Sequence, residues 1–523
     1  MTTRKSNAPD TSPGQMGFTP EVLDKTVIAI PLLHLIRQAP GAAEDVIIDL
    51  NLEYTSGRRD AALRVANLID EACSGRPKTA KNARGAKKTL GRNESKGSIS
   101  EQYVFATLTG RQIEKLVKLD TASNHAARPR HERAIYRIWP DFPIKRMTVK
   151  SVSTVKADAA RNSFAAYGEG IVWAVCDSGI DGTHPHFMEF GNLKLEEPLR
   201  HRDFTVTNDR KLDRAQLLSD PFGHGTHVAG IIAGTMTNAP GRIIQAKARY
   251  RNELGDVKAE DVKIERITGM APKCKLLSLK VLDENGDGQA SNLIAAIAEI
   301  QEINGYGRRL RVHGVNLSVG YDFNPEWFAC GQSPLCVEVD RLVKSGVVVV
   351  AAAGNSGFGY AQTAENKMVA AGMDLTINDP GNAELAITVG STHREMPHVY
   401  GVSYFSSKGP TGDGRMKPDL VAPGEKIISC RSSAIATGPG DNAAVNGNGQ
   451  APVVAAYKEE SGTSMAAPHV SGVIAAFLSA RREFIGQPER VKDIFLSTAT
   501  DLKRAPYFQG RGLVDLMRAI QSV

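Results

Sequence analysis

Residues 171–177 have the sequence Ile-Val-Trp-Ala-Val-Cys-Asp, six consecutive apolar residues that end at a carboxylate, Asp177. Similar strand-like runs occur at residues 275–281, 312–317, 347–353 and 386–389. They lack the regular in-and-out alternation of a half-exposed strand. Such runs predict strands that are buried on both faces, which is typical of a parallel sheet.

Helical patterns separate these runs, notably at residues 293–303 and 336–345. Strands that alternate with crossover helices indicate a doubly wound α/β domain. We therefore predict that residues 151–523 form one α/β domain around a parallel sheet. The Gly- and Asn-rich segment 436–452 predicts a surface insertion.

The N-terminal part shows a different and smaller pattern. Strands are predicted at residues 46–50, 103–108 and 134–139, and helices at residues 59–73 and after Thr109. This β-α-β-α-β order suits a compact ferredoxin-like α+β module over residues 20–150. Residues 1–19 are polar and rich in Pro, Ser and Gly, so they predict a disordered N-terminus.

The net charge of +7 comes from one segment, residues 74–96, which holds eight basic residues and one acidic residue. Without apolar periodicity, the segment predicts a solvated, flexible insertion in the N-terminal module. A patch for nucleic acid or an acidic partner is the alternative. No aromatic residue lies among the basic ones to stack on bases, so no nucleic-acid partner is expected.

Overall composition is that of a globular protein, with 41% hydrophobic and 23% charged residues. No run of 18 apolar residues occurs, so no membrane span is expected. The first residues lack the features of a secretory signal, which favours a cytoplasmic location. Six cysteines do not make a disulfide framework. Cys176 and Cys274 are predicted to be buried, while Cys330 and Cys336 could form a bridge but are more simply free thiols.

Three segments carry residues suited to chemistry. In the first, Asp177-Ser178-Gly179, a carboxylate emerges from the C-terminal end of a buried strand, where doubly wound sheets bind their ligands. A simple turn is the alternative. In the second, Gly223-His224-Gly225-Thr226-His227, a metal site is the alternative to a general base. No third ligand lies at helical spacing, which disfavours the metal.

The third segment is Ser461-Gly462-Thr463-Ser464, followed by a helical pattern to about residue 480. Unpaired backbone N–H groups at a helix start face whatever lies in front of Ser464. They could hold the negative oxygen formed when a serine attacks a carbonyl. A plain helix cap is the alternative.

Together the three segments resemble the subtilisin-like serine protease family, the subtilases. The order Asp177, His224, Ser464 is that of subtilisin, and the flanks D-S-G, H-G-T-H-V-A-G and G-T-S-M-A-A-P-H match as well. The resemblance extends from about residue 151 to the C-terminus. It includes N-L-S-V-G at residues 316–320 and A-A-A-G-N-S-G at residues 351–357.

The resemblance implies a serine endopeptidase. Ser464 would be the nucleophile, His224 the general base and acid, and Asp177 the residue that orients the imidazole. The remaining roles that it implies are an oxyanion donor, Asn355, a substrate-binding edge formed by Ser318, Val319 and Gly320, and a pocket lined by Ala353 and Gly354. An inactive, self-bound protein and a peptide ligase are the alternatives, although no sequence feature supports ligation.

The resemblance also implies that residues 20–150 are an inhibitory, fold-assisting prodomain. Its tail would lie in the active-site groove, and autocleavage would fall near residues 147–150. Peptide or protein substrates and this prodomain are then the expected partners.

Two features depart from the family pattern. His186 stands where an aspartate is usual, and a long charged insertion at residues 235–268 replaces a short calcium loop. No metal ligand or required cofactor is therefore predicted, and a structural calcium ion is disfavoured. Residues 283–288 predict a turn. Asn378 should lie at the pocket floor and shorten it, and Asp379 could favour a basic substrate residue.

Overall fold

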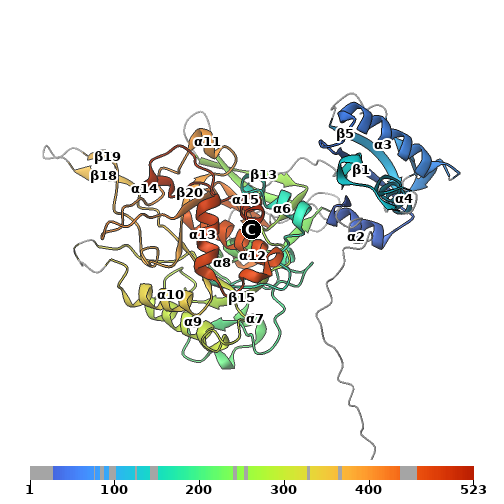
Figure 1. The fold of residues 1–523 in the computed structure, drawn as a ribbon. Helices are drawn as coiled ribbons and strands as arrows, with labels where there is room; N and C mark the ends of the chain where they lie inside the picture. Colours follow the sequence, from blue (N-terminus) through green and yellow to red (C-terminus); the bar gives the residue numbers. More distant parts are fainter. Residues whose placement is uncertain are drawn as a thin grey trace, which may run out of the picture. The chain divides into compact units, whose positions relative to one another are not determined.

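The chain folds into two compact units, Met1–Lys145 and Arg146–Val523 (Figure 1). The computed structural model describes residues 27–75, 77–82, 87–93, 102–123, 126–141, 151–238, 244–251, 257–324, 326, 330–362, 368–435 and 456–523. The expectations for residues 1–19, 147–150 and 436–452 concern segments outside the described residues.

The smaller unit contains a four-stranded antiparallel sheet in the order β4-β5-β1-β8. If these four strands are numbered 1 to 4 along the chain, their order across the sheet is 2-3-1-4, which is the ferredoxin-like arrangement. The elements of this unit are α2 (Ile30–Gln38), β1 (Ala43–Leu50), α3 (Gly57–Cys73), β2 (Thr79–Lys81), β3 (Lys87–Thr89), β4 (Gly91–Arg92), β5 (Tyr103–Thr109), α4 (Gly110–Thr121), β6 (Ala122–Ser123), β7 (Ala126–Ala127) and β8 (Ile135–Pro140).

The basic segment differs from the expected loop. Its described part contains the hairpin β2–β3 and the edge strand β4, which pairs with β5. Lys88 Nζ lies 2.8 Å from a carboxylate oxygen of Asp45 on β1. These short strands expose polar side chains on both faces, so no apolar periodicity revealed them in the sequence.

The core of the smaller unit lies between the sheet and the helices α3 and α4. Val65 and Ile69 of α3 and Ile113 and Leu116 of α4 are fully buried in it. Thr109 caps α4 through a capping box with Gln112, which explains why the helix begins directly after β5.

In the larger unit, seven strands of the described chain form a parallel sheet in the order β10-β15-β9-β16-β17-β20-β21. This confirms the predicted doubly wound α/β class. The strands are β9 (Val172–Asp177), β10 (Arg202–Asp203), β15 (Lys275–Lys280), β16 (Gly314–Leu317), β17 (Val348–Ala352), β20 (Ile387–His393) and β21 (Leu420–Glu425).

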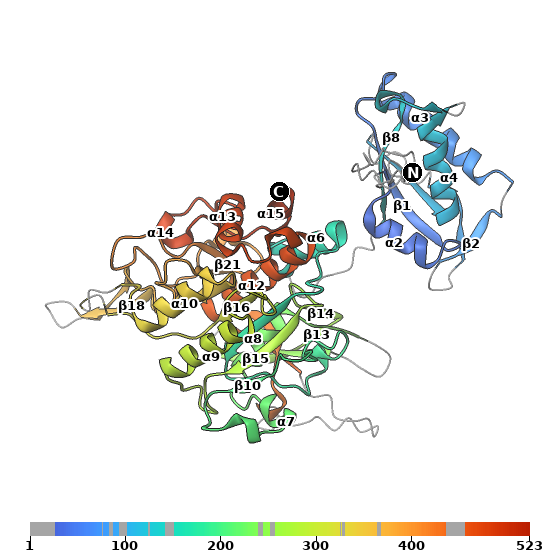
Figure 2. The same cartoon turned by 60° about the horizontal axis from the view of Figure 1, so that its bottom comes forward.

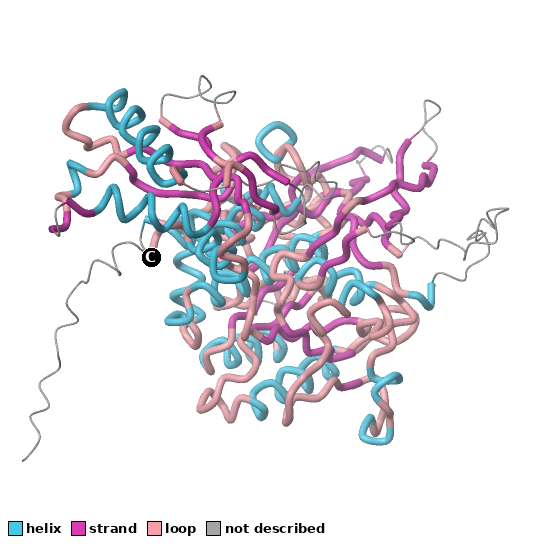
Figure 3. Tube along the Cα trace, turned by 90° about the vertical axis from the view of Figure 1, so that its right-hand side faces the viewer, coloured by secondary structure: helices cyan, strands magenta, loops and turns pink. Residues whose placement is uncertain are grey.

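Helices cover both faces of this sheet (Figures 2 and 3). On one face, Trp173 and Val175 of β9 pack in a core with α8 and α12. On the other face, Ala174 and Cys176 pack with α9 and α10. The helices of this unit are α5 (Ser151–Thr154), α6 (Ala157–Phe164), α7 (Arg214–Leu217), α8 (His224–Ile232), α9 (Ala290–Ile303), α10 (Pro334–Lys344), α11 (Pro397–Tyr400), α12 (Thr463–Ala480), α13 (Pro488–Thr498), α14 (Pro506–Gln509) and α15 (Leu516–Gln521).

The described part of the insertion at residues 235–268 contains further β-strands. Strands β12 (Ile244–Arg251) and β13 (Val257–Ile264) form a hairpin, and β12 pairs in parallel with β23 (Tyr457–Glu460). β23 also pairs with β22 (Ile427–Cys430). The hairpin therefore supports the strand that leads directly to Ser464. The other small strands are β11 (Thr235–Thr237), β14 (Arg266–Thr268), β18 (Phe358–Gln362) and β19 (Met368–Gly372).

The cysteines and the long apolar helix α12 both belong to the folded core or its surroundings rather than to disulfides or an exposed span. All six cysteines are free, as predicted, and Cys176 and Cys274 are buried. Among the described helices, α12 alone is long and apolar enough to cross a membrane, but 83% of it is buried inside the unit. That burial is typical of the core helix of a doubly wound domain.

Candidate active site

The carboxyl ends of three neighbouring parallel strands meet at one edge of the large sheet. β9 ends at Asp177, β16 leads to Ser318, and β17 leads to Asn355. Because β16 lies between β9 and β17, these side chains face a common crevice. His224 and Ser464 reach the same crevice from the N-terminal ends of α8 and α12.

Asp177 and His224 form a close pair. The carboxylate can only accept, so the Nδ1–H of His224 donates to Oδ1 of Asp177 over 2.8 Å. Asp177 is fully buried, while the His224 side chain is 21% exposed. A Cβ at Gly225 would lie 2.2 Å from the Gly179 carbonyl oxygen, so glycine is required for α8 to approach the Asp177 turn this closely.

Opposing effects set the pKa of His224. Burial lowers it, whereas the charge and hydrogen bond of Asp177, followed by the charges of Glu460 and Asp220, raise it, and the result is about 9. The Asp177 carboxylate therefore strongly stabilises the protonated form of His224. A general base needs this stabilisation because it gains a proton during the reaction.

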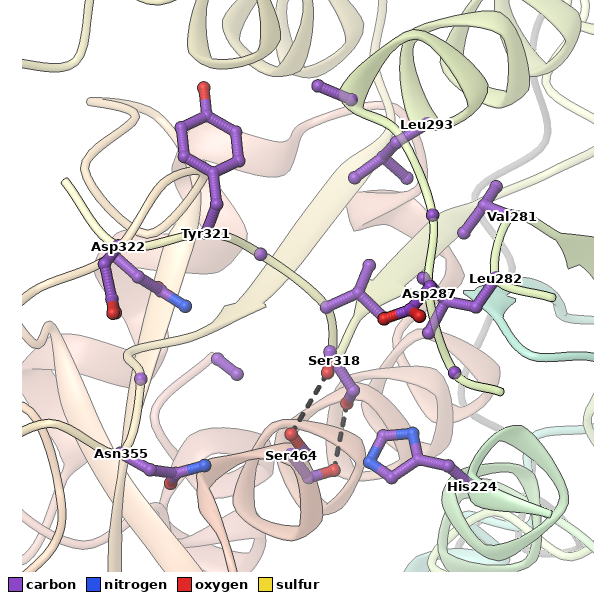
Figure 4. A pocket seen from close by; sticks show the side chains of 18 of the residues that line it. His224, Val281, Leu282, Asp287, Leu293, Ser318, Tyr321, Asp322, Asn355 and Ser464 are labelled. Carbon is purple, nitrogen blue, oxygen red and sulfur yellow. Dashed lines mark hydrogen bonds between the residues drawn. The ribbon is translucent and has the colours of Figure 1, made fainter. Parts of the chain in front are cut away.

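Ser464 is the second residue of α12 and lies beside the His224 ring (Figure 4). Its Oγ donates to the Ser318 carbonyl oxygen over 3.0 Å, and Ser318 Oγ donates to the Ser464 carbonyl oxygen over 2.9 Å. Ser464 and His224 are both described, and no hydrogen bond joins them. The hydroxyl must rotate away from Ser318 before the imidazole can take its proton, and such contacts often tighten only when substrate binds.

Asn355 presents its amide nitrogen to the space in front of Ser464 (Figure 4). Its Oδ1 accepts hydrogen bonds from the backbone N–H of Thr463 over 2.9 Å and from the Thr463 hydroxyl over 3.1 Å. With the amide oxygen held in this way, the Nδ2–H groups are free to donate to an oxygen bound next to Ser464.

A cavity of about 590 Å³ extends from these residues. Among the residues that line it are Ser318, Val319, Gly320 and Gly354, for which the resemblance implies substrate binding. Val319 and Gly320 are both described, and no hydrogen bond occupies their backbone groups, which leaves them available to an added strand.

Ala353, in contrast, was predicted to line the pocket and does not. Ala353 is fully buried and does not line the cavity, whereas its neighbours Ala352 and Gly354 do. The backbone N–H of Ala353 donates to Val389 and its carbonyl accepts from the Asn378 N–H. Both backbone groups are thus committed to the interior, and the side chain points away from the cavity.

At the predicted pocket floor, Asn378 lies between Gly320 and Gly354, which form two walls of the cavity. A Cβ on Gly320 would lie 2.8 Å from the end of the Asn378 side chain, and one on Gly354 would lie 3.3 Å from the Asn378 Cγ. The Asn378 amide therefore fills the slot between the walls, and its NH₂ group donates to the carbonyls of Ala352 and Ala353. Asp379, in contrast, is buried and accepts from Asn382 over 2.9 Å, so it does not line the cavity.

The second histidine of the motif, His227, lies away from the crevice. Its Nε2–H donates to the carbonyls of Ile427 and Lys458, each over 3.2 Å. Burial lowers its pKa to about 4, so the ring is neutral. The described part of the chain holds no group of three or more His, Cys, Asp or Glu side chains arranged for a metal ion.

Residues at the family's calcium position do not fit that ion. His186 is fully buried, and its Nε2–H donates to the Gly230 carbonyl while Nδ1 accepts from the Tyr457 hydroxyl. Burial lowers the pKa of His186 to about 3. A Cβ at Gly234 would lie 2.4 Å from the ring, so the position is densely packed around an imidazole, whereas calcium prefers oxygen ligands.

Asp220 is a functional residue that the sequence analysis missed. Its Oδ1 accepts from Ser178 Oγ over 2.8 Å and from the Gly223 N–H over 2.7 Å. Its Oδ2 accepts from the N–H of Thr226 over 2.8 Å and from the Thr226 hydroxyl over 2.6 Å. The buried carboxylate thus ties the turn after Asp177 to both sides of His224. Its place in a turn just before the histidine motif was the one available signal.

Substituting Asp220 by asparagine should lower kcat/KM roughly 10- to 100-fold, because the amide NH₂ would face donors and leave the His224 turn unsatisfied, at a cost of about 1–3 kcal/mol. The loss of charge should also move the pH profile of kcat/KM to lower pH, since Asp220 raises the pKa of His224. Asp493→Asn, at an exposed carboxylate of α13 outside the cavity, is the matched control. An unchanged pH profile in Asp220→Asn would contradict the assignment.

Comparison with known proteins agrees with this geometry. The model of the subtilase family matches residues 168–512. Subtilisin E of Bacillus subtilis is 28% identical over 430 residues, which cover 82% of this chain and 84% of that protein. Serine protease AprX of the same species is 28% identical over 383 residues, 69% of each chain.

Pyrolysin of Pyrococcus furiosus is 31% identical over 338 residues, which cover 57% of this chain but only 21% of that much longer protein. The family match spans the described crevice, from the strand that ends at Asp177 to the helix that carries Ser464. The chain therefore belongs to the subtilase family and is a subtilisin-like serine endopeptidase.

Proposed function

We propose that the protein hydrolyses peptide bonds through Asp177, His224 and Ser464, by way of an acyl-enzyme. The observation that carries the proposal is the 2.8 Å bond between His224 and Asp177, with the free side of the imidazole next to the Ser464 hydroxyl. A peptide or protein is the substrate.

In the first step, Ser464 Oγ forms a bond to the peptide carbonyl carbon while its proton passes to Nε2 of His224. The imidazolium is stabilised by Asp177 and then gives this proton to the leaving amine as the C–N bond breaks. In the second step the oxygen of a water bonds to the acyl carbon while His224 takes a proton from that water. The proton then passes to Ser464 Oγ as its bond to the acyl carbon breaks and the carboxylic acid product leaves. The atoms balance with one water consumed.

The negative oxygen of each tetrahedral intermediate would be held by Asn355 Nδ2 and the Ser464 backbone N–H. The contact of Asn355 with Thr463 supports this role, because it sets the amide orientation before substrate binds. Such preorganised donors typically account for 10²- to 10³-fold in kcat, roughly, a range that comes from subtilisin itself.

We further propose that the smaller unit is the prodomain of a zymogen, removed by autocleavage between the two units. Its ferredoxin-like sheet and its position before the protease unit support this. It would act as an intramolecular inhibitor until the linking segment is cut.

Labelling with a fluorophosphonate probe and N-terminal sequencing of the purified product test both proposals. The wild-type protein should be labelled at Ser464 and should start within or just after residues 147–150, whereas Ser464→Ala should be unlabelled and uncut. Labelling without cutting would refute autoprocessing alone. A wild type that is never labelled would refute the proposed hydrolysis.

Asn378 should restrict the residue that precedes the cleaved bond to small side chains, since its amide fills the slot between Gly320 and Gly354. Asn378→Gly should therefore raise kcat/KM for phenylalanine at this position roughly 10- to 200-fold relative to alanine. A library of peptides that differ only at this position provides the measurement, with Asp379→Asn as a neighbouring control. Wild-type preference for large aromatic residues would contradict this assignment.

A further inference from the structure

Four aromatic side chains form a row that begins three residues after Asn355. The row consists of Phe358 and Tyr360 on β18 together with Tyr404 and Phe405. Neighbouring ring centroids are 5.9 Å apart for Phe358 and Tyr360, 5.6 Å for Phe358 and Tyr404, and 5.4 Å for Tyr404 and Phe405. All three contacts are edge-to-face, the geometry that favours aromatic pairing.

The row is exposed to a degree that is unusual for such rings. Phe358, Tyr360 and Tyr404 are 40%, 65% and 68% exposed. The cross-strand partners of Phe358 and Tyr360 on β19 are Gly372 and Ala370. These residues are too small to cover the rings, so the aromatic face remains open. Clustered exposed apolar side chains usually mark an interaction site.

Hydrogen bonds tie this row to the oxyanion segment. The Gly357 N–H donates to the Phe405 carbonyl over 3.0 Å, and the Ser407 N–H donates to the Gly354 carbonyl over 2.9 Å. Lys408 Nζ donates to the Gly357 carbonyl over 2.9 Å. The segment that carries Asn355 and the segment that carries Tyr404 and Phe405 are therefore held in register, and the row begins three residues after Asn355, which lines the cavity.

We infer that the aromatic row binds apolar side chains of a protein substrate, outside the residues held in the cavity. This inference rests on the proposed function. A substrate chain that enters the cavity passes Asn355, and three residues span at most about 11 Å, so a flanking stretch of about four residues reaches Phe358. Polypeptides with apolar side chains exposed, such as unfolded proteins, fit this surface.

A second copy of the chain fits the row less well. A stable interface buries about 800 Å² on each partner, a patch that extends roughly 16 Å from its centre. Centred on Phe358, such a patch would include Asn355 and close the entrance to the cavity. A protein substrate meets no such conflict, because it must occupy the entrance itself.

Two fluorogenic peptides test the inference. Both peptides share one cleaved segment and carry a flanking tripeptide about four residues from the cleaved bond. The tripeptide is Leu-Phe-Leu in one peptide and Ser-Gly-Ser in the other. A second pair of peptides carries the same tripeptides on the other side of the bond. For the wild type we expect a KM about tenfold lower for the apolar peptide on one side, because buried aromatic contacts commonly carry that much affinity. In Phe358→Ser/Tyr360→Ser/Tyr404→Ser the two KM values should converge.

The double variant Met188→Ser/Tyr306→Ser, which removes side chains that are 61% and 66% exposed elsewhere, is the matched control and should keep the tenfold difference. Equal KM values for both peptides in the wild type overturn the inference while leaving the proposed function intact, whether or not the triple variant folds. A wild-type dimer that the triple variant dissociates, with unchanged peptide discrimination, also overturns it. Absence of any hydrolysis refutes the proposed function and the inference with it.

Discussion

Substitution of Ser464 by alanine should lower kcat by roughly 10⁶-fold, a magnitude that comes from the triad of subtilisin, a relative of this chain. The methyl group cannot attack the carbonyl, and His224 then has no hydroxyl proton to take. The residual rate should come from substrate binding and from the Asn355 amide. Initial rates on a short fluorogenic peptide, with enzyme concentration fixed by weight, provide the measurement.

The same assay can test whether Ser464 and His224 act as one unit. His224→Ala should lose about as much activity as Ser464→Ala, and the double variant should lose little more, because removing either partner abolishes the same step. His227→Gln is a useful control, since His227 is buried one turn further along α8 and takes no part in the proposed chemistry. Multiplicative losses in the double variant would mean that the two residues act separately.

Substitution of Asp177 by asparagine should lower kcat by about 10⁴-fold, since an amide no longer holds the imidazole in the tautomer that accepts the Ser464 proton. The pH dependence should change as well. His224 is active as a base only when neutral, so kcat/KM of the wild type should rise with pH through the pKa of His224, which is raised to about 9. Without the Asp177 charge this pKa falls, and the rising limb should move to lower pH.

Measurement of kcat/KM between about pH 5 and pH 10 in both proteins separates the two effects. Asp220→Asn should shift the limb in the same direction but by less, because Asp177 is both the nearer charge and the hydrogen-bond partner. If the Asp177→Asn limb stayed where it is in the wild type, the electrostatic role of Asp177 would be refuted even if kcat fell.

Sequence motifs indicated that Asn355 and residues 318–320 belong to segments near the active site. Each belongs to a short run that follows a buried strand, and the carboxyl ends of neighbouring parallel strands meet at one edge of the sheet. Local sequence therefore indicated which segments approach the cavity, and Asn355, Ser318, Val319 and Gly320 all line it. Ala353 was misassigned because a motif indicates which segment approaches the crevice, whereas backbone pairing with Val389 and Asn378 decides which side chains face it.

Asp220 and the edge strand β4 were missed for a related reason. Asp220 lies in a turn without periodicity, and its importance arises from four hydrogen bonds that exist only when the Asp177 turn and α8 are packed together. β4 is two residues long and polar, and its pairing with β5 is supplied by backbone groups rather than by an apolar pattern.

Local patterns were enough to predict the α/β class and the ferredoxin-like N-terminal module, because buried strands and crossover helices are recognised from neighbouring residues. Short motifs were enough to select the residues that we propose as the reactive groups. Three contacts of the site emerge only in the packed fold. Asp177 and His224, 47 positions apart, lie 2.8 Å from each other, the Ser464 hydroxyl donates to the Ser318 carbonyl, and Asn378 lies between Gly320 and Gly354. These contacts depend on how separate elements pack, and packing distances between remote segments are set by the whole core rather than by any local pattern.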